Sequence, residues 1–179
     1  MDGRAWLRRS QEPYDVITLE PMAPFQAGVN ALYSKEFYEL ARRRLAPDGV
    51  VAQWLPFHLV PQRGARSIVA AFLSVFPNAI LWFDPIDHTG ILVGTPAEAP
   101  IGRAWPGLDR DVARDLERRS ILGTVRLDAA DLRLFSQGAV PVTDDNQALA
   151  YGRLPAELMT GTPMLWPNLV EIQQIFDSL

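Results

Sequence analysis

Short apolar segments alternate with longer amphipathic ones in the first half of the sequence, and this alternation restricts the fold more than any other feature. Residues 15–20 and 49–55 have the length and the β-branched content of buried strands. Residues 34–46 and 62–76 follow them with apolar side chains at helical spacing. Strands that alternate with helices of this length are typical of sheets whose parallel strands are joined by crossover helices. We therefore expect an α/β fold with a mostly parallel sheet.

Capping residues, prolines and glycines predict where these elements begin and end. Ser34 can cap the first of the two helices, Pro47-Asp48-Gly49 can end it, and Pro61 can open the second. Two further apolar stretches, 79–84 and 90–95, are separated by a short polar segment and predict a hairpin. The last strand of the sheet should accordingly run antiparallel to the others.

The local composition changes beyond Thr95, where Pro, Ala and Gly become frequent. Helices are predicted over residues 109–119, after Asp128, and over 168–178. For the last of these helices, Asn168 and Glu171 have the spacing of a capping box. We divide the chain into a domain over residues 1–155 and a tail with a helix over residues 156–179.

Composition argues against several classes of function. The formal net charge is −4, so no basic excess exists to neutralise the phosphates of a nucleic acid. The sequence has no cysteine and only two histidines, His58 and His88, and we predict neither disulfides nor a metal centre. No apolar run reaches the roughly 18 residues that span a bilayer, and the first residues lack a signal-peptide pattern. The expected compartment is the cytoplasm.

Acidic residues next to predicted element ends are the candidates for chemistry. Glu20 stands at the carboxyl end of the first strand, the edge where ligands bind in open α/β sheets. A carboxylate there can accept a proton from an amine, although a strand-end Glu that faces solvent is the alternative. Asp2 and Gly3 open a short helix, where spacing alone favours Asp2 as an N-cap over a ligand contact.

A second group of candidates follows later in the chain. Asp144 and Asp145 lie in a polar loop and can hold a cation, but a turn or a helix cap explains adjacent aspartates more simply. Trp54, near the end of the second strand, can line a pocket or fill the core. The sequence contains no nucleophile elbow, P-loop or other Gly-rich phosphate loop.

An ordered series of short motifs from Asp2 to about Arg153 resembles the spermidine synthase family, in particular a bacterial branch often fused to transporter-like membrane segments. The motifs are Asp2-Gly3-Arg4 with Leu7, Tyr14-Asp15-Val16-Ile17 with Glu20-Pro21, Leu32-Tyr33-Ser34, Gly49-Val50 through Gln53-Trp54-Leu55-Pro56, Phe76-Pro77, and Thr143-Asp144-Asp145 before Tyr151. No single motif is diagnostic, but their order over most of the chain is specific.

The resemblance implies a Rossmann-like methyltransferase/spermidine synthase fold and the transfer of an aminopropyl group to an amine or polyamine. The donor it implies is decarboxylated S-adenosylmethionine, a co-substrate and not a tightly bound cofactor. By the same resemblance Glu20 is the catalytic carboxylate, and Asp2 with Gly3 contacts the adenine end of the donor. Asp144, Asp145 and Trp54 are then expected to bind the acceptor.

The sequence also departs from the family pattern. The catalytic acid is an Asp in the family and Glu20 here, and a second Asp three residues later is replaced by Ala23. The family's Gly-rich loop and its ribose-binding acid have no counterpart before Asp2. We therefore expect an N-terminally truncated domain that is inactive as given. The alternatives are a methyltransferase-like domain and a non-catalytic scaffold.

Truncation would leave the strand over 15–20 at an edge of the sheet. An unpaired apolar edge favours association. We expect this edge to pair with a second copy of the chain, to be covered by the tail helix over 168–178, or to remain open.

Overall fold

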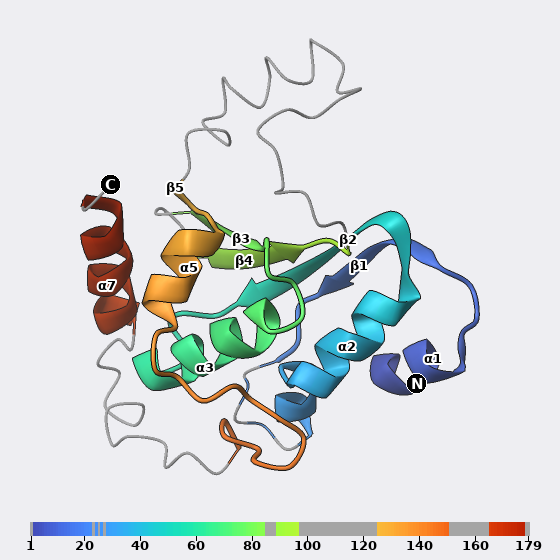
Figure 1. Ribbon diagram of the computed structural model, residues 1–179. Coiled ribbons are helices and arrows are strands. Elements are labelled where there is room, and N and C mark those ends of the chain that lie inside the picture. The colour runs from blue at the N-terminus through green and yellow to red at the C-terminus, as the bar shows by residue number, and fades with distance from the viewer. Residues whose placement is uncertain are drawn as a thin grey trace.

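The structure is a computed structural model that describes residues 2–22, 24, 26, 28–84, 89–96, 125–150 and 165–177. Its strands form a single five-stranded sheet in the order β1-β2-β4-β3-β5 (Figure 1). In chain order the elements are α1 (Gly3–Arg9), β1 (Tyr14–Leu19), a 3₁₀ turn (Val29–Leu32), α2 (Lys35–Arg44), β2 (Leu45–Leu55), α3 (Gln62–Leu73), β3 (Ile80–Asp84), β4 (Thr89–Gly94), β5 (Val125–Leu127), α5 (Ala129–Phe135) and α7 (Leu165–Asp177).

The predicted α/β architecture is confirmed, with both crossover helices in place. β1 and β2 are parallel, with Val16 opposite Val50 and Leu19 opposite Gln53. β4 lies between β2 and β3 and is antiparallel to both. Only one neighbouring pair in the sheet is therefore parallel, and the expectation of a mostly parallel sheet holds loosely. The reason is that the return strand of the β3–β4 hairpin inserts beside β2 instead of adding to the outer edge.

The helices cover one face of the sheet, which we call the covered face (Figure 1). Alternate strand side chains on this face are buried, and they are Ile17, Val51, Gln53, Leu55, Leu81, Phe83, Leu92 and Leu127. Two glycines of β4 belong to the same face. A Cβ at Gly90 would lie 2.5 Å from Cε2 of Phe57, and one at Gly94 would lie 2.6 Å from Cγ of Phe76. Aromatic rings thus approach the β4 backbone too closely for any larger residue.

The other face of the sheet, which we call the open face, is apolar in its middle. The strand register places the exposed Thr18 and the positions of Asp84, Thr89 and Arg126 on this side. Its apolar side chains are Val16, Val50, Ala52, Trp54, Ile80, Trp82, Ile91 and Val93. Val16 is 60% exposed, and the other seven are half-buried. The sheet is therefore fully buried on one side only.

α7 differs from the predicted tail helix in its start and in its place. It begins at Leu165, so Asn168 lies inside the helix and does not cap it. The Asn168 amide instead donates hydrogen bonds to the carbonyls of Phe57 and Val60, at 3.1 and 3.0 Å. α7 contacts α3 and α5, far from β1 (Figure 1). The expectation that this helix covers the β1 edge is therefore wrong.

Some expectations fall on parts of the chain that the structure does not describe. The predicted helix over 109–119 and the domain boundary at residue 155 both lie there. Across the described ranges, no helix combines the length and the apolar character needed to cross a membrane.

Candidate functional site

Two helices, α1 and α2, start next to the loop that follows β1. In the first turn of α1, Nη1 of Arg4 donates a hydrogen bond to the carbonyl of Ala31, at 2.9 Å. At the far end of α2, Nε of Arg44 donates to the carbonyl of Leu7, also at 2.9 Å. The helices therefore lie side by side and point the same way. Both N-termini, the ends that favour negative charge, face the carboxyl edge of β1.

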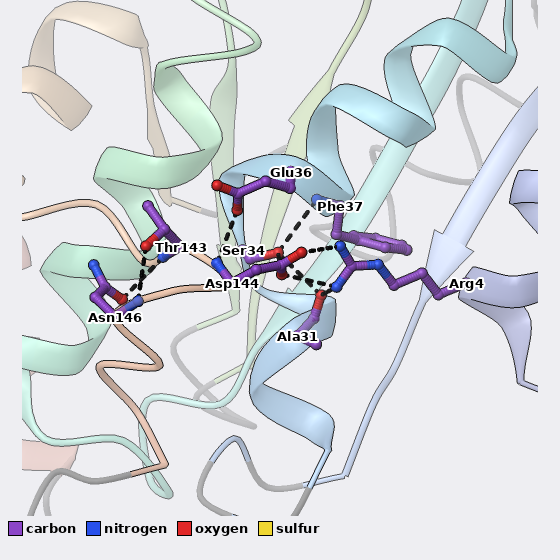
Figure 2. A network of polar contacts seen from close by, with 8 residues as sticks. All are labelled: Arg4, Ala31, Ser34, Glu36, Phe37, Thr143, Asp144 and Asn146. Atoms are coloured by element: carbon purple, nitrogen blue, oxygen red, sulfur yellow. Dashed lines mark hydrogen bonds and ion pairs between the residues drawn. The ribbon is translucent and has the colours of Figure 1, made fainter.

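Asp144 is the centre of a polar network at this edge (Figure 2). Its Oδ1 accepts hydrogen bonds from Nη1 of Arg4 at 2.8 Å and from Oγ of Ser34 at 2.7 Å. Its Oδ2 forms an ion pair with Nη2 of Arg4. The backbone N–H of Asp144 donates to Oε2 of Glu36 at 2.9 Å. One carboxylate thus connects α1, the start of α2 and the loop over 141–150.

The network sets the charge state of Asp144. The hydrogen bonds from Arg4 hold the pKa of the Asp144 carboxyl below its usual value, and Ser34 adds to this effect against the opposing effect of burial. The Arg4 side chain is only 10% exposed and that of Asp144 is 33% exposed. Both carboxylate oxygens of Asp144 are therefore occupied within the protein. Its neighbour Asp145 is exposed to solvent.

Backbone contacts hold the rest of the loop beside the helices. The N–H of Lys35 donates to the carbonyl of Val142 at 2.9 Å. The N–H of Leu149 donates to Oδ1 of the buried Asn30 at 3.1 Å. Thr143 and Asn146 close the turn through reciprocal side-chain to backbone bonds of 3.0 Å. Asp145 is consequently presented from an ordered turn.

Asp2 is the N-cap of α1, as its spacing favoured. Its Oδ1 accepts a hydrogen bond from the backbone N–H of Arg4 at 3.0 Å, which leaves Oδ2 for an external donor. Apart from its chain neighbours and its own helix, no described residue lies within 4 Å of the place where a Cβ of Gly3 would be. The start of α1 therefore has a carboxylate oxygen, and space for a group at the position of a Gly3 side chain.

Glu20 and Trp54 come from the ends of the two parallel strands. Glu20 follows the last residue of β1 and is exposed. Trp54 is half-buried on the open face, and its ring packs edge-on against His58 with centroids 5.9 Å apart. The structure joins Asp2 and Asp144 through Arg4. Within the described residues, no hydrogen bond or ion pair links Glu20 to this group.

The sequence analysis did not identify Arg4 as a site residue and named it only within the motif Asp2-Gly3-Arg4. Its partner lies 140 positions away, so no local pattern could indicate the pair. Ser34 was identified as a cap, and it does accept a hydrogen bond from the N–H of Phe37. Its additional bond to Asp144 was not foreseen. Among the described residues, no cluster of acidic and histidine side chains could hold a metal ion.

Several known proteins are similar to parts of this chain, although no family model matches it. It is 39% identical over 77 residues to polyamine aminopropyltransferase 2 of Pseudomonas aeruginosa. The matched segment covers 42% of this chain and 22% of that protein. It is 46% identical over 50 residues to polyamine aminopropyltransferase 1 of Streptomyces coelicolor, which covers 28% and 9%, respectively. The crystal structure of a probable spermidine synthase from Corynebacterium glutamicum matches with a TM-score of 0.57 and 25% identity, over 80% of this chain and 52% of that one. The chain thus spans about half of the solved relative and much less of the two curated ones.

Proposed function

We propose that this chain, whose resemblance to the spermidine synthase family is confirmed over part of its length, is part of an aminopropyltransferase domain. The observation that carries the proposal is the identity of 39% over 77 residues to a polyamine aminopropyltransferase. The position of Glu20 supports it, because an exposed carboxylate directly after a parallel strand stands where ligands bind in open α/β sheets.

In the proposed reaction, the acceptor nitrogen attacks the aminopropyl carbon next to the sulfonium of decarboxylated S-adenosylmethionine. A C–N bond forms with the nitrogen lone pair, the C–S bond breaks, and its electrons leave with methylthioadenosine as a neutral thioether. The attacking nitrogen loses a proton, which we assign to the carboxylate of Glu20. A Glu in place of the Asp of the family keeps the basic group and moves it outward by one methylene.

The remaining candidate residues receive binding roles. We assign the adenine end of the donor to Oδ2 of Asp2 and the open space beside Gly3. The cationic acceptor is assigned to Asp145 and to the half-buried Trp54, whose ring face attracts cations. Asp144, with both oxygens engaged by Arg4 and Ser34, acts by holding the loop that carries Asp145.

We further propose that the 179-residue chain alone does not catalyse the transfer. Positioning of the two substrates supplies much of the rate in such reactions. The sequence carries no Gly-rich loop to hold the tail of the donor, and it covers 22% of the Pseudomonas aeruginosa relative. A longer polypeptide that includes such a loop would restore activity.

Calorimetric titration of the purified chain with decarboxylated S-adenosylmethionine and methylthioadenosine tests whether the chain alone can bind the donor, and an activity assay tests whether it catalyses the transfer. We expect no aminopropyl transfer and no binding at micromolar ligand. Micromolar binding by the verified chain would show that these residues suffice to hold the donor.

Substitution of Glu20 tests its role as the base, and it has to be made in a longer polypeptide that is active. We expect Glu20→Gln to lower kcat by about 100-fold or more, in the range of a lost general base, with little change in donor binding. Glu12→Gln is the matched control, because Glu12 is exposed in the connection between α1 and β1. Equal activities for the two variants would contradict the role of Glu20.

A further inference from the structure

The connection between β2 and α3, residues 56–61, lies at the same edge of the sheet as Glu20. Leu19 at the end of β1 stands opposite Gln53 of β2, so Glu20 and Trp54 each follow by one position. The 56–61 connection begins two positions after Trp54, the residue that we assign to the acceptor. Its conformation therefore bears directly on the candidate site.

Two buried side chains hold the 56–61 connection against the protein. The ring of Phe57 packs edge-on against Phe83 and Phe135, with centroids 5.8 and 6.4 Å apart. Val60 is buried as well. Between these two anchors the chain turns outward, and His58 is exposed.

Asn168 of α7 joins the two anchors through their backbone. Its Nδ2 donates hydrogen bonds to the carbonyls of Phe57, at 3.1 Å, and of Val60, at 3.0 Å, and Asn168 is itself fully buried. Figure 1 shows the start of α7 beside the connection between β2 and α3. One amide group thus bridges the turn on both sides of His58, although it comes from more than 100 positions along the chain.

We propose that Asn168 is a positioning residue for the acceptor, and that it acts through the 56–61 connection. The His58 ring packs edge-on against Trp54, with centroids 5.9 Å apart, so the place of the connection determines what surrounds the Trp54 ring. A loop that is fixed in advance loses less conformational entropy on binding, and the ligand then binds more tightly. The inference rests on the proposed function, in which Trp54 contacts the acceptor.

α7 has a second set of contacts that does not involve this connection. Oε2 of Glu171 accepts a hydrogen bond from Nε2 of Gln62 at 2.6 Å, and its Oε1 pairs with Nη2 of Arg66 at 3.6 Å. Both partners belong to α3. Attachment of α7 and fixation of the connection therefore depend on different side chains, and separate variants can distinguish them.

Hydrogen exchange measured by NMR on the 179-residue chain tests the structural step. The N–H groups of Phe57 and Leu59 donate hydrogen bonds to nearby carbonyls, at 3.1 and 2.9 Å. Asn168→Asp keeps the shape of the side chain and removes the amide donor. We expect exchange of the two amides to become faster by about tenfold or more. Asn168→Ala, which introduces no charge, should have the same effect, and it decides the test if circular dichroism shows that the Asp variant is unfolded.

Steady-state kinetics of a longer, active polypeptide test the functional step. We expect Asn168→Asp and Asn168→Ala to raise KM for the amine acceptor by about tenfold, the factor that the ordering of one side chain accounts for. KM for decarboxylated S-adenosylmethionine should not change. A variant that merely lost folded protein would have a lower kcat and an unchanged acceptor KM.

Glu171→Ala is the matched control, because it removes contacts of the same helix and leaves the two bonds of Asn168 in place. It should exchange at Phe57 and Leu59, and bind the acceptor, like the wild type. Unchanged exchange in the Asn168 variants, an unchanged acceptor KM, or equal effects of Glu171→Ala would overturn the positioning role. A longer polypeptide that transfers no aminopropyl group would instead overturn the proposed function, while the exchange rates would still decide whether Asn168 fixes the connection.

Discussion

Arg4 is buried except for a tenth of its side chain, and its countercharge is Asp144. Removal of one partner from a buried ion pair typically destabilises a protein by about 3–5 kcal/mol, because the other charge remains without compensation. Asp144 is a third exposed, and water screens part of the effect. We expect Asp144→Asn to lower the free energy of unfolding by about 2 kcal/mol, measured by urea denaturation.

Asp145→Asn is the control for this substitution, because it makes the same chemical change one position along the same turn. Asp145 is exposed, so its replacement should change stability by less than about 0.5 kcal/mol. Similar losses in both variants would mean that the loop, and not the ion pair, is the source of the stability.

The same pair predicts how stability depends on pH. Because Arg4 lowers the pKa of Asp144 in the folded state, the contribution of this carboxylate is complete above its unfolded pKa of about 3.9 and is lost as pH falls through the lower folded value. The stability difference between the wild type and Asp144→Asn should therefore shrink below about pH 4. Urea denaturation of both proteins from neutral pH to about pH 3 measures it, and a constant difference would contradict the assignment.

Asp131 contributes in the opposite direction. Burial raises its pKa, with a smaller opposing effect of the hydrogen bond from the Asp128 backbone. Its folded form holds the proton more tightly than its unfolded form, so its contribution grows as pH falls. Below about pH 4 the stability of the wild type therefore reflects both carboxyl groups. Asp131 is present in the wild type and in Asp144→Asn, so the difference between the two proteins isolates the contribution of Asp144.

Local rules predicted three helix caps in this structure, but they failed at the start of α7 and at the polar network around Asp144. Ser34 and Asp128 cap α2 and α5, as a side-chain acceptor before a helical pattern indicates. Asp2 caps α1 for the same reason. Arg4 and Asp144 meet only because the folded chain brings together residues 140 positions apart. No pattern in either segment carries that information.

β4 has a strict packing requirement at its glycines. A Cβ at Gly94 would lie 2.6 and 2.8 Å from two atoms of Phe76. Overpacking of this kind costs about 1–3 kcal/mol, and we expect a loss of stability in that range for Gly94→Ala. Thermal unfolding followed by circular dichroism is a sufficient measurement.

Gly3→Ala is the comparison for Gly94→Ala, because nothing lies within 4 Å of its added methyl group. An alanine in a helix is favoured over a glycine by up to about 1 kcal/mol, so this variant should be as stable as the wild type or more stable. If both variants lost stability equally, the close approach of Phe76 would not be the cause.

The elements were predicted with more success than their arrangement. Periodicity and caps identified β1, β2, α2, α3 and the β3–β4 hairpin, because each depends on neighbours in the chain. The insertion of β4 beside β2 depends on which distant strand it meets, and no local signal indicates it. The start of α7 was predicted too late because Pro167 was taken as the boundary. A proline is tolerated in the first turn of a helix, where its missing N–H has no partner to lose.

Across the whole molecule, the order of the strands predicts a gradient of local stability. β2 and β4 have a strand on each side, while β1 has a partner only along β2 among the described residues. In a parallel pair, alternate backbone amides of a strand face its neighbour. We expect slow hydrogen exchange over residues 51–53 of β2 and 90–93 of β4, which are paired on both sides, and fast exchange at every second amide of β1, measured by NMR. Uniform protection of β1 would show that its outer edge is paired in solution.

The contact between Arg4 and Asp144 also has a consequence for the synthesis of the chain. The two residues are 140 positions apart, which corresponds to about 7–28 s at ribosomal rates of about 5–20 residues per second. During this interval the Arg4 guanidinium lacks its native partner Asp144. Burial of Arg4 requires that the loop over 141–150 has left the ribosome. α1 is translated before this loop, so its contact through Arg4 forms only after the loop has been made.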